Sequence, residues 1–200
     1  MFALRVAVPS DAEELSRLAT ETFHDGWASI IGEEFANAYA AEHLRSERLG
    51  AEIEEGDTHH FALATNAETG AIIGYGKLGL KRPAHESVLG PRPVVLQRFY
   101  VAAAGRGTGV ADALLSACEQ EATRLLFATL WLECDPRNER AWRFYERRGF
   151  IARGVSIYHY PNGFNDKIRI MERPITGGER TTSAPFAYPH KSPQDQNKAS

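Results

Sequence analysis

Residues 94–115 read VVLQRFYVAAAGRGTGVADALL, and this stretch decides the fold. Its apolar first part, Val94–Val101, predicts a buried strand. Three glycines in Gly105–Gly109 then form a turn before a helical run, Val110–Leu125. The start of a helix leaves backbone N–H groups unpaired and carries a partial positive charge, and glycines let the backbone approach a ligand closely. A strand, a glycine turn and a helix in succession therefore predict a phosphate-binding site.

Several ligands compete for such a turn. A kinase-type P-loop requires Gly-Lys-Ser/Thr at its end, where this chain has Gly109–Ala111, and a dinucleotide fingerprint requires its third glycine at the position of Val110. A methyltransferase-like site fits the Gly-x-Gly-x-Gly pattern and would use an acidic residue such as Glu133. Against that site, the preceding strand ends in Val101–Ala104, which holds no acidic residue. An ordinary turn without a ligand also remains open.

A second apolar run, Leu130–Cys134, predicts another strand, and a helix follows it. Asn138, Ala141, Trp142 and Tyr145 are spaced i, i+3, i+4 and i+7, which places them on one helical face. Asn138 and Tyr145 are two turns apart, about 10 Å along the axis. An amide and a phenol on an apolar stripe need hydrogen-bond partners, so this face favours a ligand lying along it. The alternatives are a helix cap for Asn138 and a packed core tyrosine for Tyr145.

The remaining segments predict one α/β domain over residues 1–175. Residues 176–200 are rich in Gly, Ser, Thr, Pro, Gln and Lys, and we expect this tail to be disordered. A long loop, Lys81–Pro93, is of the kind that covers a site. Ser10 is expected to cap the first helix, which carries Leu15, Leu18 and Ala19 toward the core. Strands are expected at 4–8, 60–64, 71–80, 94–101, 130–134, 151–160 and 166–171, and further helices at 29–44, 46–56, 110–125 and from 138.

Composition narrows the choice of partners. The net charge of −3 argues against a nucleic-acid-coating protein. No run approaches the roughly 18 apolar residues that span a bilayer, and the N-terminus does not resemble a secretory leader, so we expect a cytoplasmic protein without membrane contact. Cys118 and Cys134 are expected to be reduced thiols. No metal site is expected, because no ligand cluster has zinc-like spacing and the adjacent His59 and His60 point to opposite faces of a strand.

The blocks Val101–Gly109 and Asn138–Phe150 resemble the Gcn5-related N-acetyltransferases (GNAT) in order and spacing. The likeness extends over most of residues 3–173. Glu21–Asp25, Arg98–Val101 and Trp131–Leu132 are further similar to the bacterial PaiA-type polyamine acetyltransferases. The resemblance implies the GNAT fold, an α/β architecture with a mixed, mostly antiparallel sheet of about six to seven strands flanked by helices.

The same resemblance implies acetyl-CoA as the donor and direct transfer of an acetyl group to a primary amine in a ternary complex. The acceptor would be a polyamine or another small amine. Backbone groups of the 99–101 strand would meet the pantetheine arm and thioester, the turn would bind the pyrophosphate, and Asn138 would bind the arm. Tyr145 would be catalytic and would protonate the departing thiolate. The cofactor-binding residues implied are Phe99, Tyr100, Val101, Arg106, Gly107, Thr108, Gly109, Val110, Asn138 and Tyr145.

Two positions depart from the family pattern. Ala104 stands where Gln or Arg is common, so one contact to the phosphates is missing. Gln97 stands where PaiA-type relatives carry a carboxylate, so the general base is unassigned. Its candidates are Glu133, His85, Glu86 and a water held by Gln97. An acyl-CoA-binding regulatory module without turnover is therefore an alternative.

Other residues concern the acceptor and the assembly. The aromatic segment Tyr158–Tyr160 lies where the family's last hairpin often borders the acceptor site, although ordinary strand aromatics are the stronger explanation. Glu33, Glu34 and Asp57 would attract a cationic amine, or they are simply solvated charges. A homodimer is compatible with such a fold.

Overall fold

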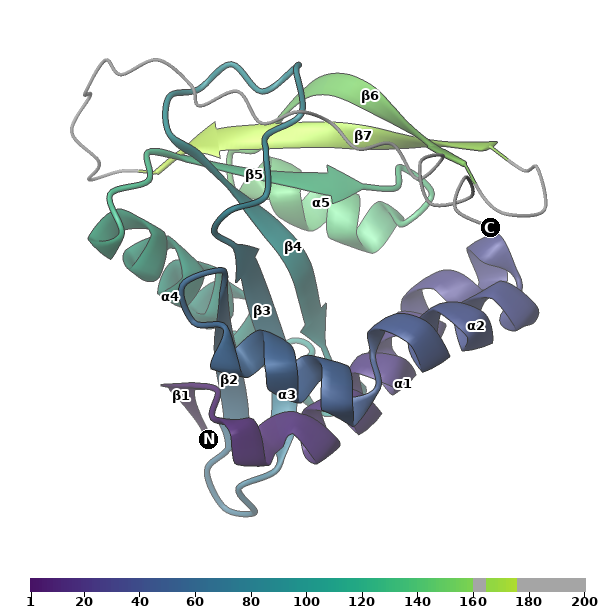
Figure 1. The fold of residues 1–200 in the computed structure, drawn as a ribbon, viewed down its shortest axis with the longest axis vertical. Coiled ribbons are helices and arrows are strands. Elements are labelled where there is room, and N and C mark those ends of the chain that lie inside the picture. Colours follow the sequence, from purple (N-terminus) through teal and green to yellow (C-terminus); the bar gives the residue numbers. More distant parts are fainter. Residues whose placement is uncertain (160–164, 176–200) are drawn as a thin grey trace, which may run out of the picture.

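The computed structural model describes residues 1–159 and 165–175, and Figure 1 shows their arrangement. Seven strands form one sheet in the order β1-β2-β3-β4-β5-β7-β6. The strands are β1 (Phe2–Val6), β2 (His59–Asn66), β3 (Ile72–Gly79), β4 (Pro93–Val101), β5 (Thr129–Cys134), β6 (Ile151–His159) and β7 (Asn165–Pro174). The helices are α1 (Ala12–Ile31), α2 (Glu33–His43), α3 (Ser46–Glu54), α4 (Val110–Arg124) and α5 (Glu139–Arg147), with short 3-10 turns at Pro9–Asp11 and Ala103–Gly105.

The strand pairing is mixed and mostly antiparallel. Every neighbouring pair is antiparallel except β4 and β5, which run parallel. The parallel pairing joins only Pro93–Val95 to Thr129–Trp131. Beyond it the two strands diverge, β4 continuing along β3 and β5 along β7 (Figure 1). The predicted α/β fold, with a mixed sheet flanked by helices, is confirmed.

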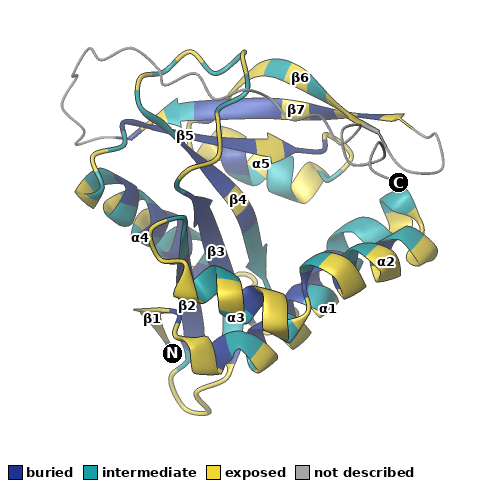
Figure 2. Ribbon diagram, in the orientation of Figure 1, coloured by how far each residue is buried: buried dark blue, intermediate teal, exposed yellow. Residues whose placement is uncertain are grey.

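Helices cover both faces of the sheet. On one face α4 and α5 pack with the inward side chains of β2–β5, and on the other α1, α2 and α3 pack against β2 and β3. Leu15, Leu18 and Ala19 are buried in the second of these cores, as predicted from their helical spacing. Figure 2 shows the central strands buried, while the outer surfaces of α2 and α3 are exposed.

The glycines of β3 let α4 approach the sheet closely. A Cβ on Gly76 would lie 2.6 Å from Sγ of Cys118, and one on Gly74 would lie 3.0 Å from Cδ1 of Leu114. Both partners are buried residues of α4. From sequence these glycines weaken the strand prediction, but in the fold they are required by helix packing.

Two local expectations are wrong. Ser10 does not cap the first helix, because Asp11 accepts a hydrogen bond from the backbone N–H of Val8 (2.8 Å) and is held by Arg5. The helix expected over 29–44 is interrupted at Gly32, whose φ of +89° ends α1 and begins α2. The expected Pro161–Gly163 turn and the 176–200 tail lie outside the described residues. Within the described ranges no helix is long and apolar enough to cross a membrane.

Replacing Gly76 by Ala should lower the free energy of unfolding by about 1–3 kcal/mol, because the new methyl group clashes with Cys118 in a packed core. Urea denaturation at neutral pH measures this. The double variant Gly76→Ala/Cys118→Ala should recover part of the loss. Gly56→Ala is the control, since nothing lies within 4 Å of its Cβ position. Equal effects of Gly76→Ala and Gly56→Ala would contradict the packing explanation.

Candidate active site

An irregularity in β4 lies next to the place where the strands diverge. Leu96 pairs with Leu78 and Arg98 with Lys77, so Gln97 has no partner on β3 and forms a bulge. The parallel pairing to β5 ends just before it, at Val95. In an extended strand, backbone groups alternate between its two edges. The segment after Gln97 therefore offers N–H and C=O groups to the gap rather than to β5.

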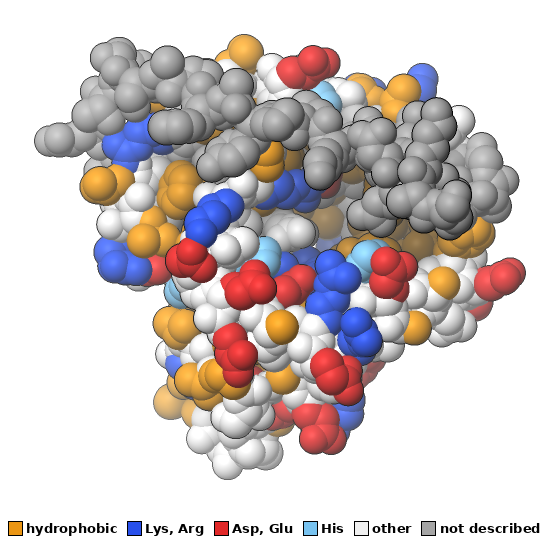
Figure 3. All heavy atoms as spheres, in the orientation of Figure 1, with side chains coloured by type: hydrophobic (Ala, Val, Ile, Leu, Met, Phe, Trp, Pro, Cys, Tyr) orange, Lys and Arg blue, Asp and Glu red, His pale blue; other side chains and the backbone are white. Residues whose placement is uncertain are grey.

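A cavity of about 200 Å³ occupies this gap. Its walls come from β4 and β5, from α5, and from α1 and α2. The lining residues are Phe23, Trp27, Ile31, Tyr39, Leu96, Gln97, Arg98, Phe99, Tyr100, Glu133, Cys134, Asp135, Asn138, Ala141, Tyr145, Tyr158 and Ile168. Figure 3 shows hydrophobic side chains in the hollow above α2, and acidic and basic side chains intermixed on the outer surfaces of the helices. The cavity is thus an apolar groove in a surface of mixed charge.

Side chains on β4 alternate between the two faces of the sheet. Phe99 stacks on Phe144 of α5 with ring centroids 5.8 Å apart, and Val101 packs in the same core. Tyr100 points the other way and accepts a hydrogen bond from Nε1 of Trp27 on α1 (3.1 Å). All three were expected to bind the cofactor. The ring of Tyr100 lies on the α1 side, so only its backbone faces the same groove edge as its neighbours.

The glycine turn has two parts with different physical roles. Gly105 is buried, and a Cβ there would lie 2.8 Å from Cγ1 of Val101, so this glycine serves packing. Gly107 and Gly109 have φ of +76° and +87° and open space around their Cβ positions. The hydroxyl of Thr108 donates to the carbonyl of Gly105 (2.8 Å) and fixes the turn. Val110 then begins α4. Its first amides and the open glycines form a fitting cradle for a phosphate group.

Two arginines carry positive charge near this turn. Arg106 contacts Asp25 of α1 (3.0 Å) and also donates to the carbonyl of Val101 (3.4 Å). Arg140, at the start of α5, was not selected from the sequence. Partial desolvation and the nearby charge of Arg106 lower its pKa, while Asp25 opposes this effect. Two arginines against one carboxylate leave an excess of positive charge beside the cradle. In the sequence, Arg140 stands two residues after Asn138. Helix-face spacing alone does not distinguish such an arginine from an ordinary solvated charge.

Asn138 and Tyr145 both line the cavity, together with Ala141. Asn138 is also the N-cap of α5, because its Oδ1 accepts from the backbone N–H of Ala141 (3.2 Å). Its oxygen is therefore used by the helix, which leaves the NH₂ group for a ligand. Trp142 packs in the α4–α5 core, although the spacing placed it on the same stripe. Tyr145 is 7% exposed, and burial raises the pKa of its hydroxyl well above its ordinary value.

A family model described as the Acetyltransferase (GNAT) family matches residues 15–150. The chain belongs to the GNAT acetyltransferase family. A Mycobacterium bovis protein named as an uncharacterized N-acetyltransferase is 27% identical over 160 residues, covering 78% of this chain and 95% of that one. A similarly named protein of Lactobacillus delbrueckii subsp. lactis is 25% identical over 148 residues, 74% of this chain and 83% of its own length.

Solved GNAT structures share the fold. PaiA N-acetyltransferase from Thermoplasma acidophilum, in complex with coenzyme A, superimposes with a TM-score of 0.67 at 19% identity, covering 87% of this chain and 99% of that one. A GNAT superfamily phosphinothricin acetyltransferase from Sinorhizobium meliloti, in complex with AcCoA, gives a TM-score of 0.64 at 23% identity, with 94% and 96% covered. The family resemblance drawn from the sequence is confirmed by these matches.

The cavity holds two of the groups considered for the general base. Glu133 and Gln97 line the cavity, whereas His85 and Glu86 belong to the 81–92 loop and are not among its described lining residues. His85 shares a hydrogen bond with Ser87 (2.9 Å) within that loop. Glu133 accepts from Nη2 of Arg82 (2.9 Å), so its charge is already compensated.

The other polar candidates lie apart from this groove. Among residues 1–159 and 165–175, no three His, Cys, Asp or Glu side chains are grouped to hold a metal ion. His59 and His60 border a separate hollow of about 420 Å³ and lie near Glu55 (3.8 Å) and Glu121 (3.6 Å) respectively. Neither the glycine turn nor α5 contributes a residue to the described lining of that hollow.

Three acidic residues considered for attracting the amine are also outside the described lining of the groove. Glu33 lies near His24 (3.3 Å), and Asp57 pairs with Lys81. Glu34 is exposed in the first turn of α2.

Both cysteines are free and buried, and burial raises the pKa of each thiol to about 12. Neither forms a thiolate at neutral pH, so neither is a nucleophile here.

Replacing Asn138 by Ala should lower the free energy of unfolding by about 1 kcal/mol, because α5 loses its cap. Asn138→Asp should stay within ~0.5 kcal/mol of the parent, since a carboxylate oxygen also accepts from Ala141 and favours a helix start. Thermal or urea unfolding followed by circular dichroism measures both. An unchanged stability of Asn138→Ala would contradict the capping role.

Proposed function

We propose that this GNAT protein transfers the acetyl group of acetyl-CoA directly to a primary amine within a ternary complex. The observation that carries the proposal is the cavity in the gap between β4 and β5, which is bordered by the unpaired edge of β4 and by Asn138 and Tyr145 of the α5 segment. The glycine turn is not among the described lining residues, but it follows directly from the end of β4 and leads into α4. The family membership and the coenzyme A complexes of the structural neighbours support the choice of donor.

Each part of the groove has a role in this reaction. Acetyl-CoA supplies the acetyl group as an activated thioester. The amides of Gly107, Gly109 and Val110 bind the pyrophosphate, with Arg106 and Arg140 adding positive charge. The NH₂ group of Asn138 donates to the pantetheine arm. Backbone N–H groups on the open edge of β4 stabilise the oxyanion that develops on the carbonyl oxygen.

Tyr145 acts on the departing sulfur. As the amine nitrogen bonds to the carbonyl carbon, the C–S bond breaks and negative charge develops on sulfur. The nitrogen then loses one proton to water and the thiolate takes up one proton from water, which gives the amide and the thiol of coenzyme A. Because the phenol pKa is raised, the hydroxyl stays protonated throughout the physiological range and remains a donor. A thiol has a pKa near 8.5, well below that of this phenol, so donation of a hydrogen bond contributes more than complete proton transfer.

The amine must reach the site without its extra proton. Gln97 orients a water that accepts this proton, since an amide cannot act as a base itself. The resemblance to PaiA-type enzymes makes polyamines one class of acceptor, and other small amines form the second class.

The activity is tested by incubating the protein with acetyl-CoA and a panel of polyamines, amino acids, aminoglycosides and peptide N-termini, and following thiol release. Thiol release with at least one amine is expected. Tight coenzyme A binding without thiol release from any amine would instead identify a binding module. Binding of S-adenosylmethionine but not of coenzyme A, measured by calorimetry, would indicate the methyltransferase alternative.

Tyr145→Phe should lower kcat about 10²-fold while changing the Kd for coenzyme A less than twofold, because only the donor to sulfur is lost. Steady-state kinetics and calorimetry measure the two quantities. Since the phenol remains protonated up to high pH, the wild-type rate should not fall between pH 7 and 9 through its ionisation. Equal losses in kcat and affinity would reject the proposed role.

Arg140→Gln should raise the Kd for coenzyme A about three- to tenfold, and the difference should shrink as salt is added, because the contribution is electrostatic. Arg143→Gln is the matched control, since Arg143 lies on the same helix and pairs with Glu139 (2.7 Å) away from the groove. Isothermal calorimetry at 50 and 300 mM salt measures both. A similar change in the two variants would count against a phosphate contact by Arg140.

A further inference from the structure

One side of the groove is a wall of aromatic rings, which we call the aromatic wall. It is formed by Phe23 and Trp27 of α1, Tyr39 of α2, Tyr100 of β4 and Tyr158 of β6, all of which line the cavity. Phe23 stacks between Tyr39 (centroids 4.4 Å apart, planes 10° apart) and Trp27 (6.0 Å and 20°). The hydrogen bond from Trp27 to Tyr100 ties α1 to the sheet. The rings of Phe23, Trp27, Tyr39 and Tyr100 therefore hold one another in place, and together with Tyr158 they give this side of the cavity an aromatic lining.

The aromatic wall lies opposite the cofactor face. Phe99 and Tyr145 belong to the core with α4 and α5, whereas Trp27, Tyr39 and Tyr100 belong to the core with α1 and α2. A thiol-bearing arm bound along α5 would leave this second side for the acceptor. The shape and charge of the aromatic-wall side thus determine which amine is accepted.

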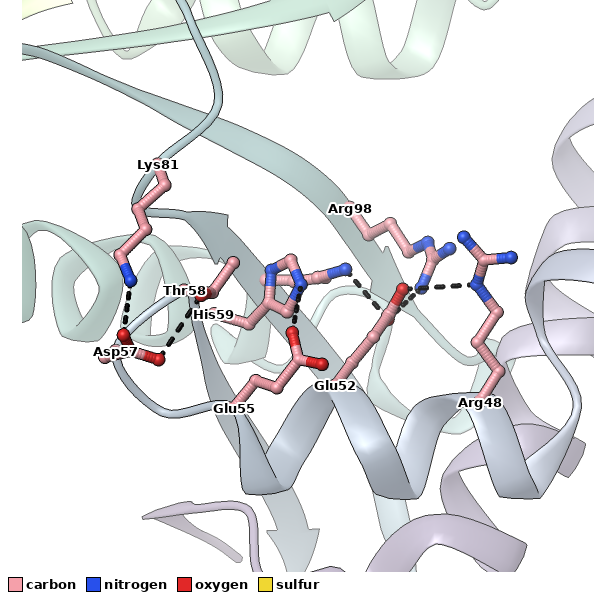
Figure 4. Close-up of polar contacts among 9 residues, drawn as sticks. Arg48, Glu52, Glu55, Asp57, Thr58, His59, Lys81 and Arg98 are labelled. Carbon is pink, nitrogen blue, oxygen red and sulfur yellow. Dashed lines mark hydrogen bonds and ion pairs between the residues drawn. The ribbon is translucent and has the colours of Figure 1, made fainter. Parts of the chain in front are cut away.

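A buried cation cluster, formed by Lys77, Arg98 and Glu52, adjoins the wall. Nζ of Lys77 lies 2.8 Å and Nη1 of Arg98 lies 3.1 Å from the same oxygen of Glu52. Lys77 is fully buried, Arg98 is 7% exposed, and Arg98 itself lines the cavity. Figure 4 shows Glu52 reaching from α3 toward Arg98, with Arg48 on its outer side. Two buried cations share one partly buried carboxylate, so the part of the groove beside Arg98 carries an excess of positive charge.

The two carboxylates that line the cavity each have an arginine partner. Glu133 pairs with Arg82 (2.9 Å). Asp135 is 1% exposed, and both its oxygens accept hydrogen bonds from Arg137, which also contacts Asp166. Among the described lining residues these two and Arg98 are the charged groups. Because Asp135 and Asp166 share one arginine, that part of the lining carries a negative excess, whereas a second ammonium group beside Arg98 would meet the positive excess of the buried cation cluster.

Resting on the proposed transferase activity, we infer that the acceptor is a primary amine attached to an aromatic or similarly flat apolar group, with no second positive charge on the part that lies against the aromatic wall and Arg98. The ring of the acceptor stacks on the aromatic wall, and burial of its apolar surface supplies the affinity. Aromatic rings alone would also attract a cation, but the buried cation cluster opposes a polycation by Coulomb repulsion in a partly desolvated site.

The buried cation cluster also assists the reaction. A nearby cation disfavours the ammonium form of the acceptor, so the neutral amine that attacks is more populated. The same effect operates within the cluster. Burial, and after it the charge of Arg98, lowers the pKa of Lys77 from 10.5 to about 8.

A comparison of acceptors tests the inference directly. With saturating acetyl-CoA, kcat/KM from thiol release should be at least tenfold higher for 2-phenylethylamine than for spermidine, and higher than for propylamine, which lacks the ring. A spermidine value equal to or above that of 2-phenylethylamine would overturn the aromatic assignment and leave the transferase proposal standing. No thiol release with any amine would overturn both.

Substitutions in the aromatic wall test whether the acceptor binds there. Tyr39→Leu should raise KM for 2-phenylethylamine about tenfold, with kcat and the Kd for coenzyme A changed less than twofold. Tyr39→Phe keeps the ring and loses only the hydroxyl that contacts Arg98, so it should raise KM much less than Tyr39→Leu. Trp27→Leu provides the same comparison from α1 if Tyr39→Leu does not fold by circular dichroism. An unchanged KM in a folded Leu variant would contradict acceptor binding by the aromatic wall.

Discussion

The separation of β4 from β5 after only three paired positions is the constraint on which the rest of the structure depends. Parallel pairing ends at Val95, and the bulge at Gln97 follows at once. Strand edges normally pair or are covered, because open backbone groups are costly when buried. Here the edge borders a groove, so its free N–H and C=O groups are available to a substrate.

The alternation of side chains along β4 lets one strand serve two substrates. Phe99 and Val101 pack toward α4 and α5, where the glycine turn and Tyr145 form the proposed donor side. Arg98 and Tyr100 project toward α1, α2 and α3, where the aromatic wall and the buried cation cluster form the proposed acceptor side. The reacting groups would meet at the gap between them. This two-sided arrangement follows directly from the period of two in an extended chain.

Local patterns predicted the fold well, because hydrophobic periodicity and glycine turns are set by nearby residues. The β4, turn and α4 succession and the cavity-lining positions of Asn138 and Tyr145 followed from spacing alone. The aromatic wall did not, because it joins residues from four elements that only the tertiary structure brings together. The break at Gly32 and the pairing of Arg106 with Asp25 were likewise missed, since each depends on partners distant in sequence or on a single backbone angle.

The most direct test of the central claim is a crystal structure of the protein with coenzyme A. We expect the pyrophosphate on the amides of Gly107–Val110, the arm between β4 and β5, and the sulfur within hydrogen-bond reach of the Tyr145 hydroxyl. Coenzyme A bound elsewhere, or a gap between β4 and β5 closed by side chains, would contradict it.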